Sequence, residues 1–180
     1  MQIPIRPLNA SDVHAYKALR DAALRHAPEA FLSDYESAVQ RPAGAYAQRF
    51  GKPLSGTFFL GAFDAGGRLV GSVGCERELR TKQRHSATLV GMMVAPHAQR
   101  QGMGRALLHA CVAVAARVPG LEQLTLSVTA SNTHVVRLYE SAGFRAWGLL
   151  PRAMLVDGVA YDKLHMIRPL HPSEPERKNP

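Results

Sequence analysis

The chain has 180 residues, 46% of them hydrophobic and 20% charged, a composition that suits a single folded domain with one core. Its formal net charge of +8 favours anionic ligands. Residues 1–6 lack the basic-then-apolar layout of a secretion signal, and the apolar run at residues 110–116 is far shorter than the roughly 20 residues of a membrane span. We therefore expect a cytoplasmic protein with no membrane partner.

The first half of the chain predicts a strand, two helical regions and then three strands. The spacing of apolar residues changes between the period of a helix and that of a strand. In chain order, the expected elements are a strand at residues 3–8, a helix capped by Ser11 that ends near His26, a broken helical region at 28–52, a hairpin of 57–64 and 68–79, and a strand at 85–94. The inner face of the first helix carries Val13, Tyr16, Leu19 and Ala23.

The second half predicts a helix, a strand, a second helix and a hairpin. In chain order, these are a helix that opens at Gly102 and Gly104, a half-buried strand at 124–128, a helix over 133–142 capped by Asn132 and closed by Gly143, and a hairpin of 145–156 and 159–166 around Asp157 and Gly158. Cys75 falls on a predicted strand and Cys111 on the apolar face of a predicted helix. We expect both to be buried thiols without a disulfide.

Positive charge is densest at residues 77–85, where no aromatic side chain lies among the basic ones. Surfaces that bind single-stranded nucleic acid combine basic groups with aromatic platforms. The cluster is better explained as a solvated hairpin end, so we expect no nucleic-acid partner, although the net charge of +8 keeps open a protein that modifies charged RNA.

Two glycines one residue apart, Gly102 and Gly104, follow a turn marked by Pro96 and open a helix. The free N–H groups and the positive end of such a helix favour an anion, and Arg100 and Arg105 add charge. A P-loop is excluded because no Lys and hydroxyl follow the glycines, and the third glycine of a dinucleotide-binding fingerprint is replaced by Leu107. The segment therefore predicts a phosphate cradle of another kind.

Two motifs together resemble the GNAT superfamily of acyl-CoA-dependent N-acetyltransferases. The first is Gln-x-x-Gly-x-Gly, with Gln99 at its start, and the second runs from Asn132 through Leu138-Tyr139-Glu140 to Gly143-Phe144. Val136 stands where a small residue is common. The resemblance implies an α/β (α+β) fold: a mixed, mostly antiparallel six- to seven-stranded sheet, splayed at its central parallel pair, with about four helices on its faces. Residues 1–170 would form this domain and 171–180 a disordered tail.

The resemblance also implies a reaction, in which an acetyl group moves from acetyl-CoA to a primary amine without a metal. Tyr139 matches the family's general acid, and the main chain at Met93 and Val94 would bind the pantetheine arm and the thioester oxygen. The remaining residues implied in coenzyme binding are Gln99, Arg100, Gln101, Gly102, Met103, Gly104, Arg105 and Asn132, with Tyr139 again among them.

The general base is open, because the strand at 85–94 lacks the carboxylate that the family often places there. Glu76 and Glu36 are the candidates, while Glu78, a histidine or a chain of waters are alternatives. Phe31, Tyr35 and Glu36 are expected to line the acceptor pocket.

Several acceptors fit the sequence. A small amine, an amino-acid-like compound or an antibiotic is the first choice, and a peptide or ribosomal-protein N-terminus is the second. A non-catalytic acyl-CoA-binding module and a homodimer also stay open.

Overall fold

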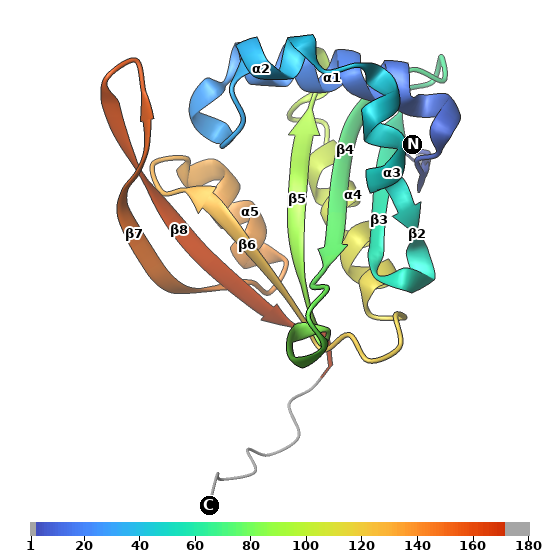
Figure 1. The fold of residues 1–180 in the computed structure, drawn as a ribbon, viewed down its shortest axis with the longest axis vertical. Helices are drawn as coiled ribbons and strands as arrows, with labels where there is room; N and C mark the ends of the chain where they lie inside the picture. The colour runs from blue at the N-terminus through green and yellow to red at the C-terminus, as the bar shows by residue number, and fades with distance from the viewer. Residues whose placement is uncertain (1–2, 172–180) are drawn as a thin grey trace, which may run out of the picture.

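The computed structural model describes residues 3–171, which form one mixed sheet with helices on both faces (Figure 1). The strands are β1 (Ile5–Pro7), β2 (Gly51–Lys52), β3 (Thr57–Phe63), β4 (Leu69–Arg77), β5 (Ser86–Val94), β6 (Gln123–Thr129), β7 (Arg145–Val156) and β8 (Val159–Pro169). Their order is β1-β3-β4-β5-β6-β8-β7, and β2 pairs with β3 outside this path. Only β5 and β6 run parallel. The predicted fold class is confirmed, and the two-residue β2 brings the strands of the sheet to eight.

Five α-helices flank the sheet. They are α1 (Val13–His26), α2 (Tyr35–Gln40), α3 (Ala47–Phe50), α4 (Met103–Ala115) and α5 (Thr133–Ser141). Short 3-10 turns link them: η1 (Ala10–Asp12), η2 (Pro28–Ala30), η3 (Ala43–Tyr46), η4 (Pro53–Ser55), η5 (Thr81–Gln83) and η6 (Pro96–Ala98). None of the helices within residues 3–171 is long and apolar enough to cross a membrane. The tail expected at 171–180 lies outside the described residues from 172 onward.

The predicted cap at Ser11 is wrong. Asn9 caps the turn η1 instead, because its Oδ1 accepts from the Ser11 N–H at 2.9 Å while Asp12 Oδ2 accepts from the Asn9 N–H at 2.9 Å. This reciprocal pair is a capping box, and α1 begins only at Val13. Of the predicted inner face, Val13, Tyr16 and Leu19 are buried, and Ala23 is half-buried against the same core.

Two apolar cores lie on opposite faces of the sheet. The first joins the sheet to α4 and α5, and includes Leu107, Cys111 and Tyr139; both cysteines are buried free thiols, as expected. The second joins the sheet to α1, η3 and α3 through an aromatic cluster of Tyr16, Tyr46, Phe50 and Phe59. Because side chains alternate along a strand, β3, β4 and β5 contribute side chains to both cores.

Gly74 on β4 is set by the aromatic cluster. A Cβ there would lie 2.5 Å from two ring atoms of Phe59, a residue with no exposed surface, whereas a Cβ at exposed Gly44 would meet no heavy atom within 4 Å. We expect Gly74→Ala to lower the free energy of unfolding by about 1–3 kcal/mol through overpacking. Gly44→Ala should leave it unchanged or slightly raised. Urea denaturation of both variants measures the difference, and equal midpoints would contradict this account of Phe59 packing.

Candidate functional site

A crevice opens where β5 and β6 part. The two strands pair at only three positions, Ser86↔Gln123, Ala87↔Leu124 and Thr88↔Thr125. The Oγ1 atoms of Thr88 and Thr125 lie 3.3 Å apart at the last of these. Beyond these positions the two strands diverge and form a V, whose closed end lies at the paired residues. Helices α1 and α2 cross over the wide end of this V (Figure 1). The main chain of β5 over 89–94 therefore has no strand partner on its β6 side.

A bulge in β5 lies on the open stretch. The register with β4 shifts between Ser72 and Gly74, which face Met93 and Val90, so β5 holds one extra residue. Gly91 there has φ of +59°, a conformation that favours glycine. The hydroxyl of Tyr16 would be 3.4 Å from a Cβ at Gly91, and it is buried without a hydrogen-bond partner among residues 3–171.

Val94 turns its peptide groups into the crevice. Val94 lies opposite Gly71 on β4, and the N–H of the next residue, Ala95, donates to Val70 O at 2.8 Å. Gly71 and Val94 are therefore a non-hydrogen-bonded pair of the antiparallel ladder. The Val94 N–H and C=O consequently point away from β4, toward the open edge. The carbonyl accepts from Gln99 Nε2 at 3.0 Å, whereas no acceptor for the N–H is found within residues 3–171.

Met93 lies the other way. As the neighbour of Val94 it turns its peptide groups toward β4, and its side chain is buried in the core beside α1. The structure thus places Val94, but not Met93, at the open edge.

The loop after β5 ends in an open helix start. Arg100 and Gly102 have φ of +60° and +77°, and Gln101 Nε2 donates to His97 O at 3.0 Å. The first helical hydrogen bond of α4 runs from Ala106 N to Gly102 O, so the N–H groups of residues 102–105 have no acceptor within residues 3–171. A Cβ at Gly102 would meet no heavy atom within 4 Å, so space above these donors is open. Free donors at the positive end of a helix form an anion cradle.

The predicted members of this loop divide into two groups. Arg100, Gln101 and Arg105 are exposed, whereas the Met103 side chain is buried in the first core, so Met103 offers only its main chain. Gly104 is half-buried at the junction of three elements, because a Cβ on it would lie 3.5 Å from Met92 of β5 and 3.5 Å from Leu138 of α5.

Asn132 starts α5 on the far limb of the V. Its Oδ1 accepts from the Val135 N–H at 3.4 Å, so the predicted cap is confirmed.

Tyr139 lies on the buried face of α5. Its ring is 5% exposed and packs edge-on against Phe144 at 5.8 Å, in the core that also holds Cys111. Burial, with a smaller contribution from Cys111, raises the pKa of the Tyr139 hydroxyl well above its usual range. This phenol therefore keeps its proton at neutral pH, and within residues 3–171 its hydroxyl makes no hydrogen bond.

Glu76 has a fixed orientation on β4. It lies directly across from Thr88, and its Oε1 accepts from Arg49 Nε at 3.0 Å and Nη2 at 2.7 Å. Its Oε2 has no partner among the described residues. Arg49 of α3, which also stacks over Phe59 with its Cζ 5.3 Å from the ring centroid, was not found by sequence analysis. It lies 27 residues from Glu76, and no local pattern joins the two.

The predicted acceptor-side residues follow α1. Phe31 and Tyr35 are half-buried, and the Arg25 guanidinium lies 5.9 Å from the Tyr35 ring centroid. Glu36 is exposed in the first turn of α2, and within residues 3–171 it makes no ion pair. The structure therefore places Glu76 on the sheet near the closed end of the V, whereas Glu36 lies on α2, exposed to solvent.

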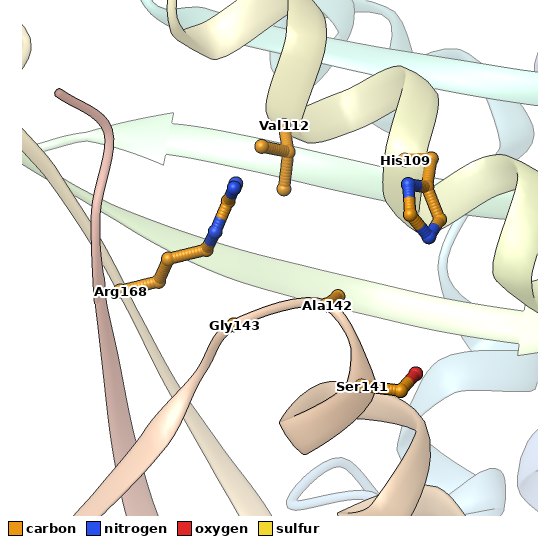
Figure 2. A pocket seen from close by; sticks show the side chains of 6 residues that line it. All are labelled: His109, Val112, Ser141, Ala142, Gly143 and Arg168. Carbon is orange, nitrogen blue, oxygen red and sulfur yellow. The ribbon is translucent and has the colours of Figure 1, made fainter. Parts of the chain in front are cut away.

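A separate hollow of about 280 Å³ lies between α4 and the end of α5. Figure 2 shows Arg168 reaching into it from β8, beside Val112 and Gly143, with His109 and Ser141 at its other side. Nη1 of Arg168 is buried without a hydrogen-bond partner among residues 3–171. This hollow lies on the α4 side of the sheet, away from α1 and α2.

The sequence matches the Acetyltransferase (GNAT) family over residues 17–144, more than half of its length. The chain belongs to this family, as the two motifs predicted. The yncA protein of Salmonella typhimurium, solved with its cofactor acetyl-CoA, has the same fold: its TM-score is 0.79 at 21% identity, over 99% of this chain and all of that one.

Two characterised enzymes share parts of the sequence. Mycothiol acetyltransferase of Salinispora tropica is 32% identical over 148 residues, which are 81% of this chain and 48% of the relative. [Ribosomal protein bS18]-alanine N-acetyltransferase of Escherichia coli is 47% identical over 58 residues, 32% of this chain and 38% of the relative. This chain therefore spans about half the length of the first relative, and the similarity to the second is local.

Proposed function

We propose that this protein is an N-acetyltransferase that moves an acetyl group from acetyl-CoA to the primary amine of a small or amino-acid-like acceptor. The observation that carries the proposal is the open edge of β5, which leads at Val94 directly into the unsatisfied helix start of α4. The free N–H group of Val94 and those of residues 102–105 together suit a long ligand with an amide-bearing arm and an anionic end.

The residues present fit acetyl-CoA. The N–H groups of residues 102–105 would bind the pyrophosphate, with Arg100 and Arg105 adding positive charge. The free N–H of Val94 would pair with the pantetheine arm or the thioester oxygen, while Gln99 fixes the loop to the end of β5. Asn132, which caps α5, would contact the same arm from the other side of the crevice.

The acceptor must first lose a proton. An alkyl amine has a pKa near 10.4, so only about one molecule in a thousand is neutral at pH 7.4. Glu76 is the proposed base, because Arg49 holds one carboxylate oxygen and leaves the other free on the face toward α1. Glu76 lies opposite Thr88, below the open stretch, so it would take the proton through water.

Direct attack then forms the new C–N bond, and a tetrahedral intermediate collapses by breaking the C–S bond. The electron pair leaves with sulfur as a thiolate. Glu76 passes the proton that it took from the ammonium group through water to the solvent, and it then takes the second proton, which the attacking nitrogen loses as the amide forms. Tyr139 would donate a hydrogen bond to the departing sulfur. Because the pKa of this phenol is raised above its ordinary value while a thiol has a pKa near 8.5, the phenol stays protonated and stabilises the thiolate by hydrogen bonding.

A peptide N-terminus is the second candidate acceptor. The 47% identity to the bS18-alanine N-acetyltransferase over 58 residues favours it, since that relative acts on a ribosomal protein. The wide end of the V under α1 and α2 is where either acceptor would enter (Figure 1).

Acetyl-CoA should stabilise the protein. At about 100 times its dissociation constant, the ligand is expected to add about 2.7 kcal/mol to the free energy of unfolding, measured by thermal shift. The double variant Arg100→Ala/Arg105→Ala should weaken binding about 3- to 10-fold at low salt and less at high salt. Arg117→Ala, which removes an exposed arginine beyond the other end of α4, is the control. No shift with acetyl-CoA would overturn the proposed function.

Tyr139→Phe tests the hydrogen bond to sulfur. We expect kcat to fall about 10- to 100-fold while KM for acetyl-CoA stays nearly constant, because the contact strengthens only as sulfur leaves. CoA release is followed with a thiol reagent. Tyr46→Phe, a buried tyrosine in the other core, is the matched control. An unaltered kcat in Tyr139→Phe would remove Tyr139 from the mechanism.

Glu76→Gln tests the base. We expect kcat/KM for the amine to fall about 10- to 100-fold near neutral pH, with acetyl-CoA affinity unchanged. The deficit should shrink as the pH rises, because more of the amine is already neutral. Exposed Glu122→Gln is the control. A rate deficit that stays constant with pH would argue for a structural role of the Arg49–Glu76 pair.

A further inference from the structure

Lys163 on β8 is a buried cation without a counter-ion. Lys163 is 4% exposed, and its Nζ donates to Oγ1 of Thr129, which lies directly across on β6, at 2.9 Å. That hydroxyl in turn donates to the Glu29 carbonyl of η2 at 2.6 Å. Among residues 3–171 no carboxylate oxygen lies within 4.0 Å of Nζ. Two of the three ammonium donors are therefore unused by the chain.

The neighbouring acids do not compensate this charge. Asp162 precedes Lys163, but alternation along the strand turns its side chain to the opposite face, and its Oδ1 accepts from the Arg152 N–H at 2.8 Å. Glu29 contributes its main-chain carbonyl to Thr129, and its carboxylate makes no ion pair within residues 3–171. Desolvation lowers the pKa of Lys163, as expected for an ammonium group removed from water.

Arg20 of α1 repeats the pattern from the other side. It is 8% exposed, its Nη2 donates to Ser33 Oγ at 2.9 Å, and no carboxylate lies within 4.0 Å among residues 3–171. Lys163, through Thr129, and Arg20 both hold the segment 27–34, which joins α1 to α2. Buried charges are expensive unless they are paired, so two cations that have no carboxylate partner among residues 3–171 and lie beneath one segment indicate an anion from outside these residues.

The anion is not the pyrophosphate of acetyl-CoA. Val128 and Leu164, which flank the pair on each strand, point into the core beside α4 and α5. Thr129 and Lys163 therefore face the opposite side, toward η2. The proposed pyrophosphate cradle is the N-terminus of α4, and α4 covers the same face as Val128 and Leu164. Lys163 thus belongs to the acceptor side of the sheet.

We propose that the acceptor is an amino acid whose carboxylate binds Lys163 beneath segment 27–34, while its amine attacks the thioester. This inference rests on the proposed acetyl transfer and narrows its substrate class. An ammonium–carboxylate contact inside the protein is a charge-assisted hydrogen bond, which selects strongly against an uncharged analogue. A free carboxylate also separates this acceptor from a peptide N-terminus, in which the same carbon carries a neutral amide.

Matched trios of acceptors test the proposal. L-Methionine, L-leucine and L-phenylalanine are each compared with the corresponding amino-acid amide and decarboxylated amine, and CoA release is measured with acetyl-CoA. The wild-type protein should prefer at least one amino acid over both of its analogues by about 10- to 100-fold in kcat/KM. Intrinsic reactivity works against this preference, because the amine of an amino-acid amide is less basic and more of it is neutral near pH 8. The amides also represent a peptide N-terminus.

The variant Lys163→Met should abolish the preference. We expect kcat/KM for the favoured amino acid to fall to the level of its amide, while the amide rate changes by less than about twofold. Lys52→Met, at exposed β2, should keep the preference. Folding and coenzyme binding are checked separately through the melting temperature and its rise with acetyl-CoA, which Lys163→Met should retain, since replacing an unpaired buried charge by an apolar group is tolerated.

Four outcomes would overturn the inference. Equal use of amino acids and their analogues by the wild type, or an unchanged preference in Lys163→Met, would refute the role of Lys163 and leave acetyl transfer intact. A preference for the amides would refute it in favour of a peptide acceptor. Absence of CoA release with every acceptor would instead contradict the proposed function itself, and with it this inference.

Discussion

The crevice depends on the end of one pairing, between β5 and β6 at Thr88 and Thr125. In a continuous parallel ladder the N–H and C=O groups of β5 that point away from β4, among them those of Val94, would bond to β6, and no ligand could reach them. The limbs separate because each has its own support: β5 stays with β4 and packs on α4, whereas β6 leaves with β8 and β7 (Figure 1). The parallel pair is thus both the structural junction of two antiparallel units and the floor of the proposed active site.

Because side chains alternate along each strand, the two faces of the sheet carry different residues and would bind different ligands. On β6, Val128 packs against the core beside α4 and α5, and Thr129 faces η2. One face would hold the nucleotide end of the co-substrate and the other the acceptor, so the two meet only at the open edge of β5. The peptide groups of a strand lie in the plane of the sheet rather than on either face. Those of Val94 point in this plane into the crevice.

Local signals in the sequence predicted local structure well. The loop at Gly102, the cap at Asn132 and the turn at Asp157 and Gly158, with φ of +49° and +81°, involve residues within a few positions of one another. Ser11 was wrong because Asn9 offers a competing cap two residues earlier. Met93 and Val94 differ by one residue, and therefore in the direction of their peptide groups, which register with β4 decides. Contacts such as Arg49–Glu76 and Lys163–Thr129, 27 and 34 residues apart, leave no trace in local periodicity.

The buried position of Tyr139 bears on which step limits the rate. Its raised pKa makes full proton transfer to a thiolate unfavourable, so its contribution is a hydrogen bond in a medium of low dielectric constant. Removing the proton from an alkyl ammonium at pH 7.4 requires roughly 4 kcal/mol, about 1.36 for each pH unit below a pKa near 10.4. The acceptor side of the crevice, through Glu76, therefore controls how much nucleophile forms, while the α5 side serves the leaving group.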